Sequence, residues 1–164
     1  MSDHPVVEHF GGLPQQDEGA TNDRPVGARR PGGELSPGRP VLGFVVRDFR
    51  HSTVLSVTGE VDIATTPSLT AALDKAIRAG GRYLVCDLTG VSFIGSSGLT
   101  AILIGHRLAE KSGVRLDVVC TRSSLIRKVI VLTGLDIVFG LHASVSDAIA
   151  DQACLAQAVG AMSQ

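Results

Sequence analysis

The sequence RYLVCDLTGVSFIGSSGLTAIL, residues 82–103, carries the strongest structural signal in the chain. Its first part, residues 82–90, is a continuous apolar run, which is typical of a strand in the middle of a sheet or of one covered on both faces. The tetrad GSSG, residues 95–98, then leads into apolar residues at helical spacing, which predict a helix over about residues 97–112. A buried strand that passes into an amphipathic helix predicts a parallel crossover.

Strands and helices alternate on both sides of this segment. Two β-rich runs joined by a short polar link predict an antiparallel pair, with Gly59 at the end of its second strand. The strands are expected at 42–49, 52–59, 82–90, 114–120 and 135–141, and the helices at 67–78, 97–112, 121–134 and 144–162. This order predicts an α/β domain with a mixed, mostly parallel β-sheet and helices packed on it.

The first 40 residues differ in composition from the rest of the chain. Six of the seven prolines and seven glycines lie there, without apolar periodicity. This predicts a disordered Pro/Gly-rich tail over residues 1–40, although a docking segment that uses Arg24 and Arg29-Arg30 stays open. We expect the folded domain to span residues 41–151, and residues 152–164 to hold the end of the last helix and a C-terminal tail.

Charge and composition exclude several classes of function. The formal net charge of −1 argues against direct binding to nucleic acid. No apolar run is long enough to span a membrane, and the N-terminus does not resemble a secretory signal, so we expect a cytoplasmic protein with no membrane partner. The three cysteines are widely spaced and fit neither a disulfide scaffold nor a metal knuckle.

A search for catalytic motifs gives negative results. The chain has no phosphate-binding loop or dinucleotide fingerprint, and GSSG lacks the G-x-S-x-G spacing of a nucleophile elbow. A serine hydrolase would also need a base from His51, His106 or His142. No two histidines lie three or four residues apart on one helix face, so no metal site and no cofactor are expected. These observations argue against an enzyme.

Ser96 and Ser97 lie where the strand passes into the helix. The helix dipole is positive there and favours a negative group by ~0.3–1 kcal/mol at an exposed site. A phosphoserine would bring nearly two negative charges to this position. From physical chemistry alone the alternative stays open that Ser97 is an ordinary N-cap and Ser96 a passive neighbour.

The segments TGEVD (58–62) and DLTGVSFIGSSGL (87–99) resemble the STAS domain of anti-sigma factor antagonists, also called anti-anti-sigma factors. The resemblance covers about residues 41–151 and implies a sheet with helices on one side. It also implies partner switching in transcription regulation and stress response. The antagonist binds an anti-sigma factor of the serine-protein kinase type and frees the sigma factor.

The resemblance places the phosphorylated residue at Ser96, with Ser97 the less favoured neighbour. The implied partner-binding residues are Asp62, Gly95, Ser96, Ser97, Gly98 and Leu99. Phosphorylated members often carry Asp immediately before the first serine, whereas this chain has Gly95. A binding module without a phosphorylation cycle therefore stays open, as does the STAS subunit of a lipid-transport complex.

Two further points concern assembly and redox control. The sequence leaves a weak homodimer open. Cys86 and Cys120 lie near the ends of two consecutive strands, so they are a candidate redox pair if the strands are neighbours and their Cα atoms approach within ~4.4–6.8 Å. The alternative is two buried thiols that act as small apolar groups.

Overall fold

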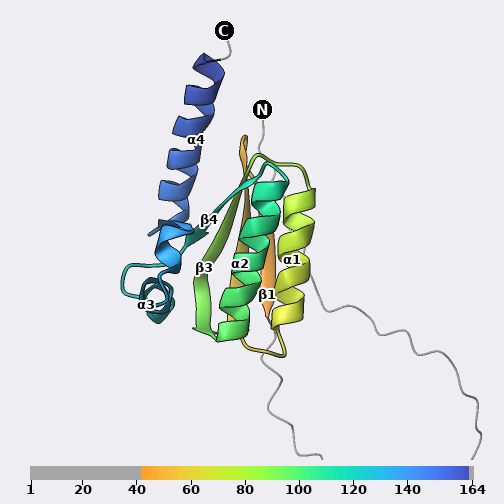
Figure 1. Ribbon diagram of the computed structural model, residues 1–164, viewed down its shortest axis with the longest axis vertical. Coiled ribbons are helices and arrows are strands. Elements are labelled where there is room, and N and C mark those ends of the chain that lie inside the picture. The colour runs from red at the N-terminus through yellow and green to blue at the C-terminus, as the bar shows by residue number, and fades with distance from the viewer. Residues whose placement is uncertain (1–41, 163–164) are drawn as a thin grey trace, which may run out of the picture.

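The structure is a computed structural model that describes residues 42–162 (Figure 1). Within these residues, five strands form one sheet in the order β1-β2-β3-β4-β5. The strands are β1 (Gly43–Asp48), β2 (Ser52–Val61), β3 (Tyr83–Ile94), β4 (Arg115–Val119) and β5 (Gly140–His142). The helices are α1 (Thr66–Arg78), α2 (Ser96–Lys111), α3 (Leu125–Leu132) and α4 (Val145–Ala161), with a 3-10 turn η1 (Leu135–Ile137).

The sheet is mixed and mostly parallel, which confirms the predicted fold class. Strand β1 pairs with β2 in the antiparallel sense, and every other pair is parallel. The polar link between β1 and β2 closes through backbone hydrogen bonds in both directions between Phe49 and Ser52. The parallel pairs place the C-terminal ends of neighbouring strands at one edge of the sheet.

The two faces of the sheet have different coverings. Helices α1, α2 and α3 pack on one face over a core that includes Leu55, Cys86 and Val118. The alternate residues Val54, Val85 and Val119 face the other way and pack against Ala148 of α4, together with Val145 and Ile149. The first half of α4 therefore covers the face opposite α1 and α2, so the expectation of helices on one side only is wrong for α4. Figure 1 shows the rest of this helix projecting past the sheet.

Several predicted element boundaries are wrong. Strand β3 continues past the predicted end at Gly90 to Ile94, and α3 spans Leu125–Leu132 instead of residues 121–134. Strand β2 runs through Gly59, which has φ 109°, and continues to Val61 with a register irregularity at this glycine. The strand predicted over residues 135–141 is instead the turn η1 followed by the three-residue β5. The chain leaves α3 at Gly134 with φ 71°, and the N–H groups of Val138 and Phe139 bond back to the carbonyl of Leu135, which closes a turn before β5 can pair.

The predicted tail of residues 1–40 lies outside the described residues, as do Arg24 and Arg29-Arg30. Within the described part of the chain, no helix is long and apolar enough to cross a membrane.

Candidate functional site

The N-terminus of α2 is the centre of the candidate site. β3 ends at Ile94, the N–H of Gly95 bonds to the carbonyl of Val61 at 2.8 Å, and α2 starts at Ser96. Gly95 is the N-cap, so the interpretation of Ser97 as the N-cap is wrong. No side chain caps the helix and its first turn has no acidic residue. Ser96 is exposed and is the first residue of α2, whose first N–H groups have no partner within the helix.

Asp62 organises the loop between β2 and α1. Its Oδ1 accepts hydrogen bonds from the backbone N–H groups of Ala64 and Thr65, both at 2.9 Å, and from the Thr65 hydroxyl at 3.1 Å. The backbone hydrogen bond from Thr65 is the main reason why the pKa of Asp62 lies below its ordinary value. The carboxylate is therefore ionised at neutral pH and holds the loop in one conformation.

The loop and the helix start are joined through hydroxyl groups. The Thr66 hydroxyl bonds to the carbonyl of Asp62 at 2.6 Å and lies within hydrogen-bond distance, 3.1 Å, of the Ser97 hydroxyl. Ser97 is half-buried, unlike its neighbour Ser96. The structure thus brings together the predicted residues Asp62 and Ser97, and Thr66 is the connecting residue that sequence reasoning missed.

Gly98 and Leu99 set the position of the helix start but do not present side chains at the surface. Gly98 is buried, and an added Cβ there would lie 2.5 Å from Cγ1 of Val61 and 2.9 Å from Cγ1 of Ile94. Leu99 is 7% exposed and belongs to the core. The close approach of α2 to Val61 therefore holds Ser96 and Ser97 against the Asp62 loop.

A shallow groove of about 240 Å³ begins at Ser96. It runs between the first turns of α2 and the turn after α3, and it is lined by Ser96, Leu99, Thr100, Leu103, Thr133 and Leu135. Sequence reasoning missed Thr133 and Leu135, because both lie in the segment where it expected the end of a helix and a strand. The groove gives a partner an apolar floor beside the exposed hydroxyl.

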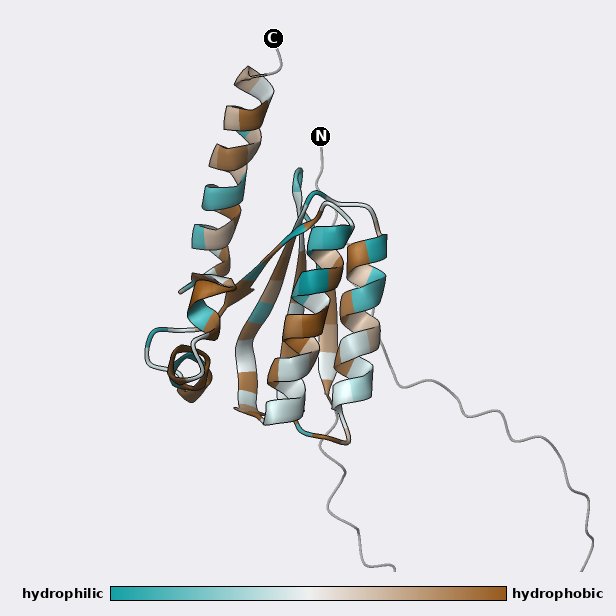
Figure 2. Cartoon of the chain, viewed as in Figure 1, coloured by the Kyte–Doolittle hydropathy of each residue, from teal (hydrophilic) through white to brown (hydrophobic). Residues whose placement is uncertain are grey.

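Large apolar side chains are also exposed in the Asp62 loop, at the end of α3 and in η1. Ile63 of the Asp62 loop is 83% exposed, Leu132 at the end of α3 is 86% exposed and Ile137 of η1 is 88% exposed. Figure 2 shows α3 almost entirely brown, whereas α1 and α2 carry many polar residues. The sequence did contain a signal for these exposed apolar groups. Residues 125–139 hold more apolar side chains than one amphipathic helix can bury, so some of them had to be exposed.

The structure contradicts the Cys86–Cys120 redox pair. Cys86 lies opposite Val118 in the β3–β4 register, so Cys120 is two residues further along the chain, just past the end of β4. Strand spacing and rise then put the two Cα atoms about 8 Å apart, beyond the reach of a disulfide. Both thiols are buried and free, and burial raises the pKa of Cys86 to about 12. They act as small apolar core groups.

Comparisons with known proteins agree on one family. A family model described as the STAS domain matches residues 45–148. The chain is 37% identical over 110 residues to the anti-sigma-F factor antagonist RsfB of Mycobacterium tuberculosis, and the match covers 66% of this chain and 87% of RsfB.

Solved structures show the same fold. An anti-sigma factor antagonist from Mycobacterium paratuberculosis matches with a TM-score of 0.62 and 32% identity, over 68% of this chain and 93% of that chain. The anti-sigma factor antagonist SpoIIAA in its unphosphorylated form matches with a TM-score of 0.54 and 25% identity, over 65% of this chain and 92% of that chain.

Proposed function

The chain belongs to the STAS domain family, and we propose that it is an anti-sigma factor antagonist that uses the surface around Ser96 to bind its partner. Its relatives RsfB and SpoIIAA are anti-sigma factor antagonists. In this proposal the unmodified protein binds an anti-sigma factor of the serine-protein kinase type and thereby releases a sigma factor. The protein acts by binding and performs no reaction itself.

The observation that carries the proposal is the position of Ser96. Its side chain is exposed, at an uncapped helix N-terminus, and it borders an apolar groove, while the neighbouring Ser97 contacts Thr66 at the end of the Asp62 loop. Apolar groups such as Leu132 and Ile137 supply area that a partner can cover. The hydroxyl and carboxylate groups supply polar contacts that depend on the orientation of the partner.

A phosphate on Ser96 would affect the free and bound proteins differently. In the free protein the unpaired N–H groups and the positive end of the α2 dipole favour the added charge. In the complex the same charge would lie in the interface and would be separated from water, which adds desolvation cost and repulsion from any negative group of the partner. About 3 kcal/mol against binding would lower the affinity more than a hundredfold.

Gly95 has space around it for a larger side chain, but it lacks the carboxylate that an aspartate would place next to Ser96. Its backbone is extended, with φ −86° and ψ 174°, and an added Cβ would meet its nearest atoms, in Phe93 and Val61, at 3.6 Å. An aspartate would therefore fit here without rearrangement. We propose that the kinase recognises the Asp62 loop and the groove instead of a carboxylate at residue 95.

The test is phosphorylation of the full chain by the cognate anti-sigma kinase with ATP, followed by mapping of the modified residue by mass spectrometry. We expect one phosphate on Ser96 and none on a Ser96→Ala variant. Ser92→Ala is the matched control, because Ser92 is an exposed serine of β3, and it should be modified like the wild type. Robust labelling of Ser96→Ala would exclude Ser96 from this role. Binding to a transporter ATPase instead of a kinase would favour the lipid-transport alternative.

A further inference from the structure

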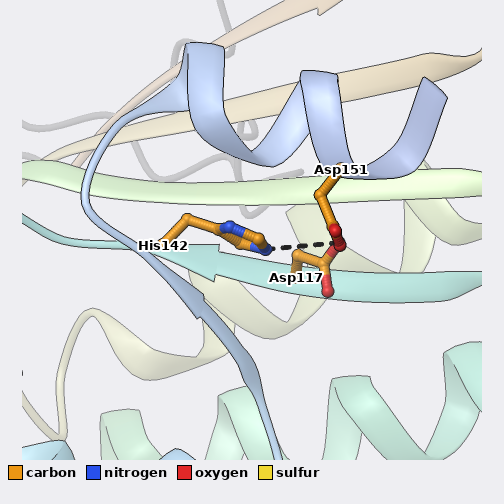
Figure 3. Close-up of side chains that lie close together, drawn as sticks. All are labelled: Asp117, His142 and Asp151. Atoms are coloured by element: carbon orange, nitrogen blue, oxygen red, sulfur yellow. Dashed lines mark ion pairs between the residues drawn. The ribbon is translucent and has the colours of Figure 1, made fainter. Parts of the chain in front are cut away.

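A second cluster of polar groups lies on the sheet face opposite α1 and α2. It contains Asp117 of β4, His142 at the end of β5 and Asp151 of α4, whose side chains converge in Figure 3. One ligand atom from each residue lies within 4.8 Å of the other two. Asp117 is 1% exposed, whereas Asp151 is partly open to solvent, so the cluster has a buried end and an accessible end.

Neighbouring side chains hold both carboxylates in place. Asp117 Oδ1 accepts a hydrogen bond from Arg115 Nε at 3.0 Å, and its Oδ2 accepts one from Gln152 Nε2 at 2.7 Å. Arg115 also donates through Nη2 to Asp151 Oδ2 at 3.1 Å. Metal-binding carboxylates are commonly oriented by hydrogen bonds of this kind from outside the ligand set.

The imidazole of His142 adds a nitrogen donor to the two carboxylates of the cluster. Its Nε2 is buried, and within residues 42–162 it has no hydrogen-bond partner, although it lies only 3.9 Å from Asp117 Oδ2. A buried nitrogen without a hydrogen-bond partner destabilises the folded protein. The guanidinium of Arg115 balances one of the two carboxylates, so these three groups together keep a formal charge of −1. A cation beside Nε2 would satisfy both the nitrogen and this charge.

We propose that Asp117, His142 and Asp151 bind a divalent transition-metal ion, with Zn²⁺ as the best chemical fit. An imidazole nitrogen and carboxylate oxygens are both ligands that Zn²⁺ accepts in proteins, and water would complete the coordination. Arg115 stays outside the ligand set and orients the carboxylates. The ion would link β4, β5 and α4, so it would fasten the first half of α4 to the sheet.

Zinc binding to the full chain tests this proposal. The background is Cys154→Ser, because Cys154 is an exposed thiol that would compete for zinc. We expect saturable binding of ZnCl₂ by isothermal titration calorimetry at pH 7.5. We also expect the melting temperature to rise on the order of 5–10 °C at a hundredfold excess over Kd.

Two variants and one control locate the site. His142→Ala and Asp151→Asn should each weaken this binding at least tenfold, and Asp151 is exposed enough for its variant to fold if the other does not. His51→Ala, an exposed histidine in the β1–β2 link, should leave it unchanged.

Three results would overturn the proposal. The first is the absence of saturable binding up to about 1 mM zinc, since a site this weak would not hold the ion in a cell. The second is zinc binding that neither His142→Ala nor Asp151→Asn weakens. The third combines two observations: zinc does not change the melting temperature, and lowering the pH from 7.5 to 5.5 raises it only when His142 is present. That result would show that a proton and not a metal fills the site.

Discussion

An alanine at residue 98 would place a methyl group 2.5 Å from Cγ1 of Val61 and 2.9 Å from Cγ1 of Ile94. Val61 is completely buried and Ile94 is 6% exposed, so neither side chain can move into solvent. Overpacking of this kind costs about 1–3 kcal/mol, and the helix propensity of alanine returns at most about 1 kcal/mol. We therefore expect Gly98→Ala to lower the free energy of unfolding by about 1–2 kcal/mol in urea denaturation followed by circular dichroism.

A double-mutant cycle shows whether Val61 is the cause. Val61→Ala alone should cost about 2–4 kcal/mol, because it leaves a cavity in the core. The same substitution opens space for the new methyl group, so the double variant should be less destabilised than the two single losses added together, by about 1 kcal/mol or more. Gly160→Ala is the control, since nothing lies within 4 Å of its added Cβ, and it should not destabilise the protein.

Two outcomes would contradict this reasoning. One is a Gly98→Ala variant as stable as the wild type. The other is strict additivity of Gly98→Ala and Val61→Ala, which would mean that the two residues do not compete for the same space. In either case the contact with Val61 could not be what holds the start of α2 against the Asp62 loop.

Three further predictions concern single groups. Gly95→Asp should stabilise the protein by about 0.3–1 kcal/mol in urea, because aspartate is a slightly better N-cap and its charge lies at the positive end of the α2 dipole. A loss of stability would show that the helix start is misplaced. Asp62→Ala should be less stable than the wild type at pH 7. The pKa of Asp62 is lowered in the folded state, so this difference in stability should fade as the pH falls below the ordinary aspartate value of 3.8. A difference that persists in acid would mean that the ionised carboxylate is not its source. A thiol reagent should modify one cysteine, Cys154, in the native protein and all three in denaturant, whereas rapid native labelling of Cys86 or Cys120 would contradict their burial.

Sequence reasoning predicted most of the fold because helices and strands in this chain end at recognisable residues. Ser124 caps α3 by accepting the N–H of Arg127, and Gly80 and Gly113, both with positive φ, follow α1 and α2. It failed over residues 135–141, where a short apolar run does not distinguish a strand from a turn. The sequence also did not show which face of the sheet α4 covers. That face is determined by the direction in which alternate side chains of β2, β3 and β4 point.

The part of the candidate site that follows two neighbouring strands could be predicted from the sequence. The loop at Asp62 follows β2 and the serine pair follows β3, and adjacent parallel strands bring these ends to one edge. The Thr66–Ser97 contact and the groove residue Thr133 depend on side-chain packing between elements far apart in the sequence. The cluster around Asp117 was missed for a similar reason, since its donors come from three separate elements and not from one helix face.

The affinity of the anti-sigma factor for this protein, before and after phosphorylation of Ser96, is the measurement on which the proposed function stands. Calorimetric titration of the full chain should give tight binding for the unmodified form and binding at least about a hundredfold weaker for the phosphorylated form. Ser96→Ala should bind like the unmodified protein and should keep that affinity after treatment with kinase and ATP. Equal affinities for the two forms of the wild-type protein would contradict a charge-controlled docking surface at the start of α2.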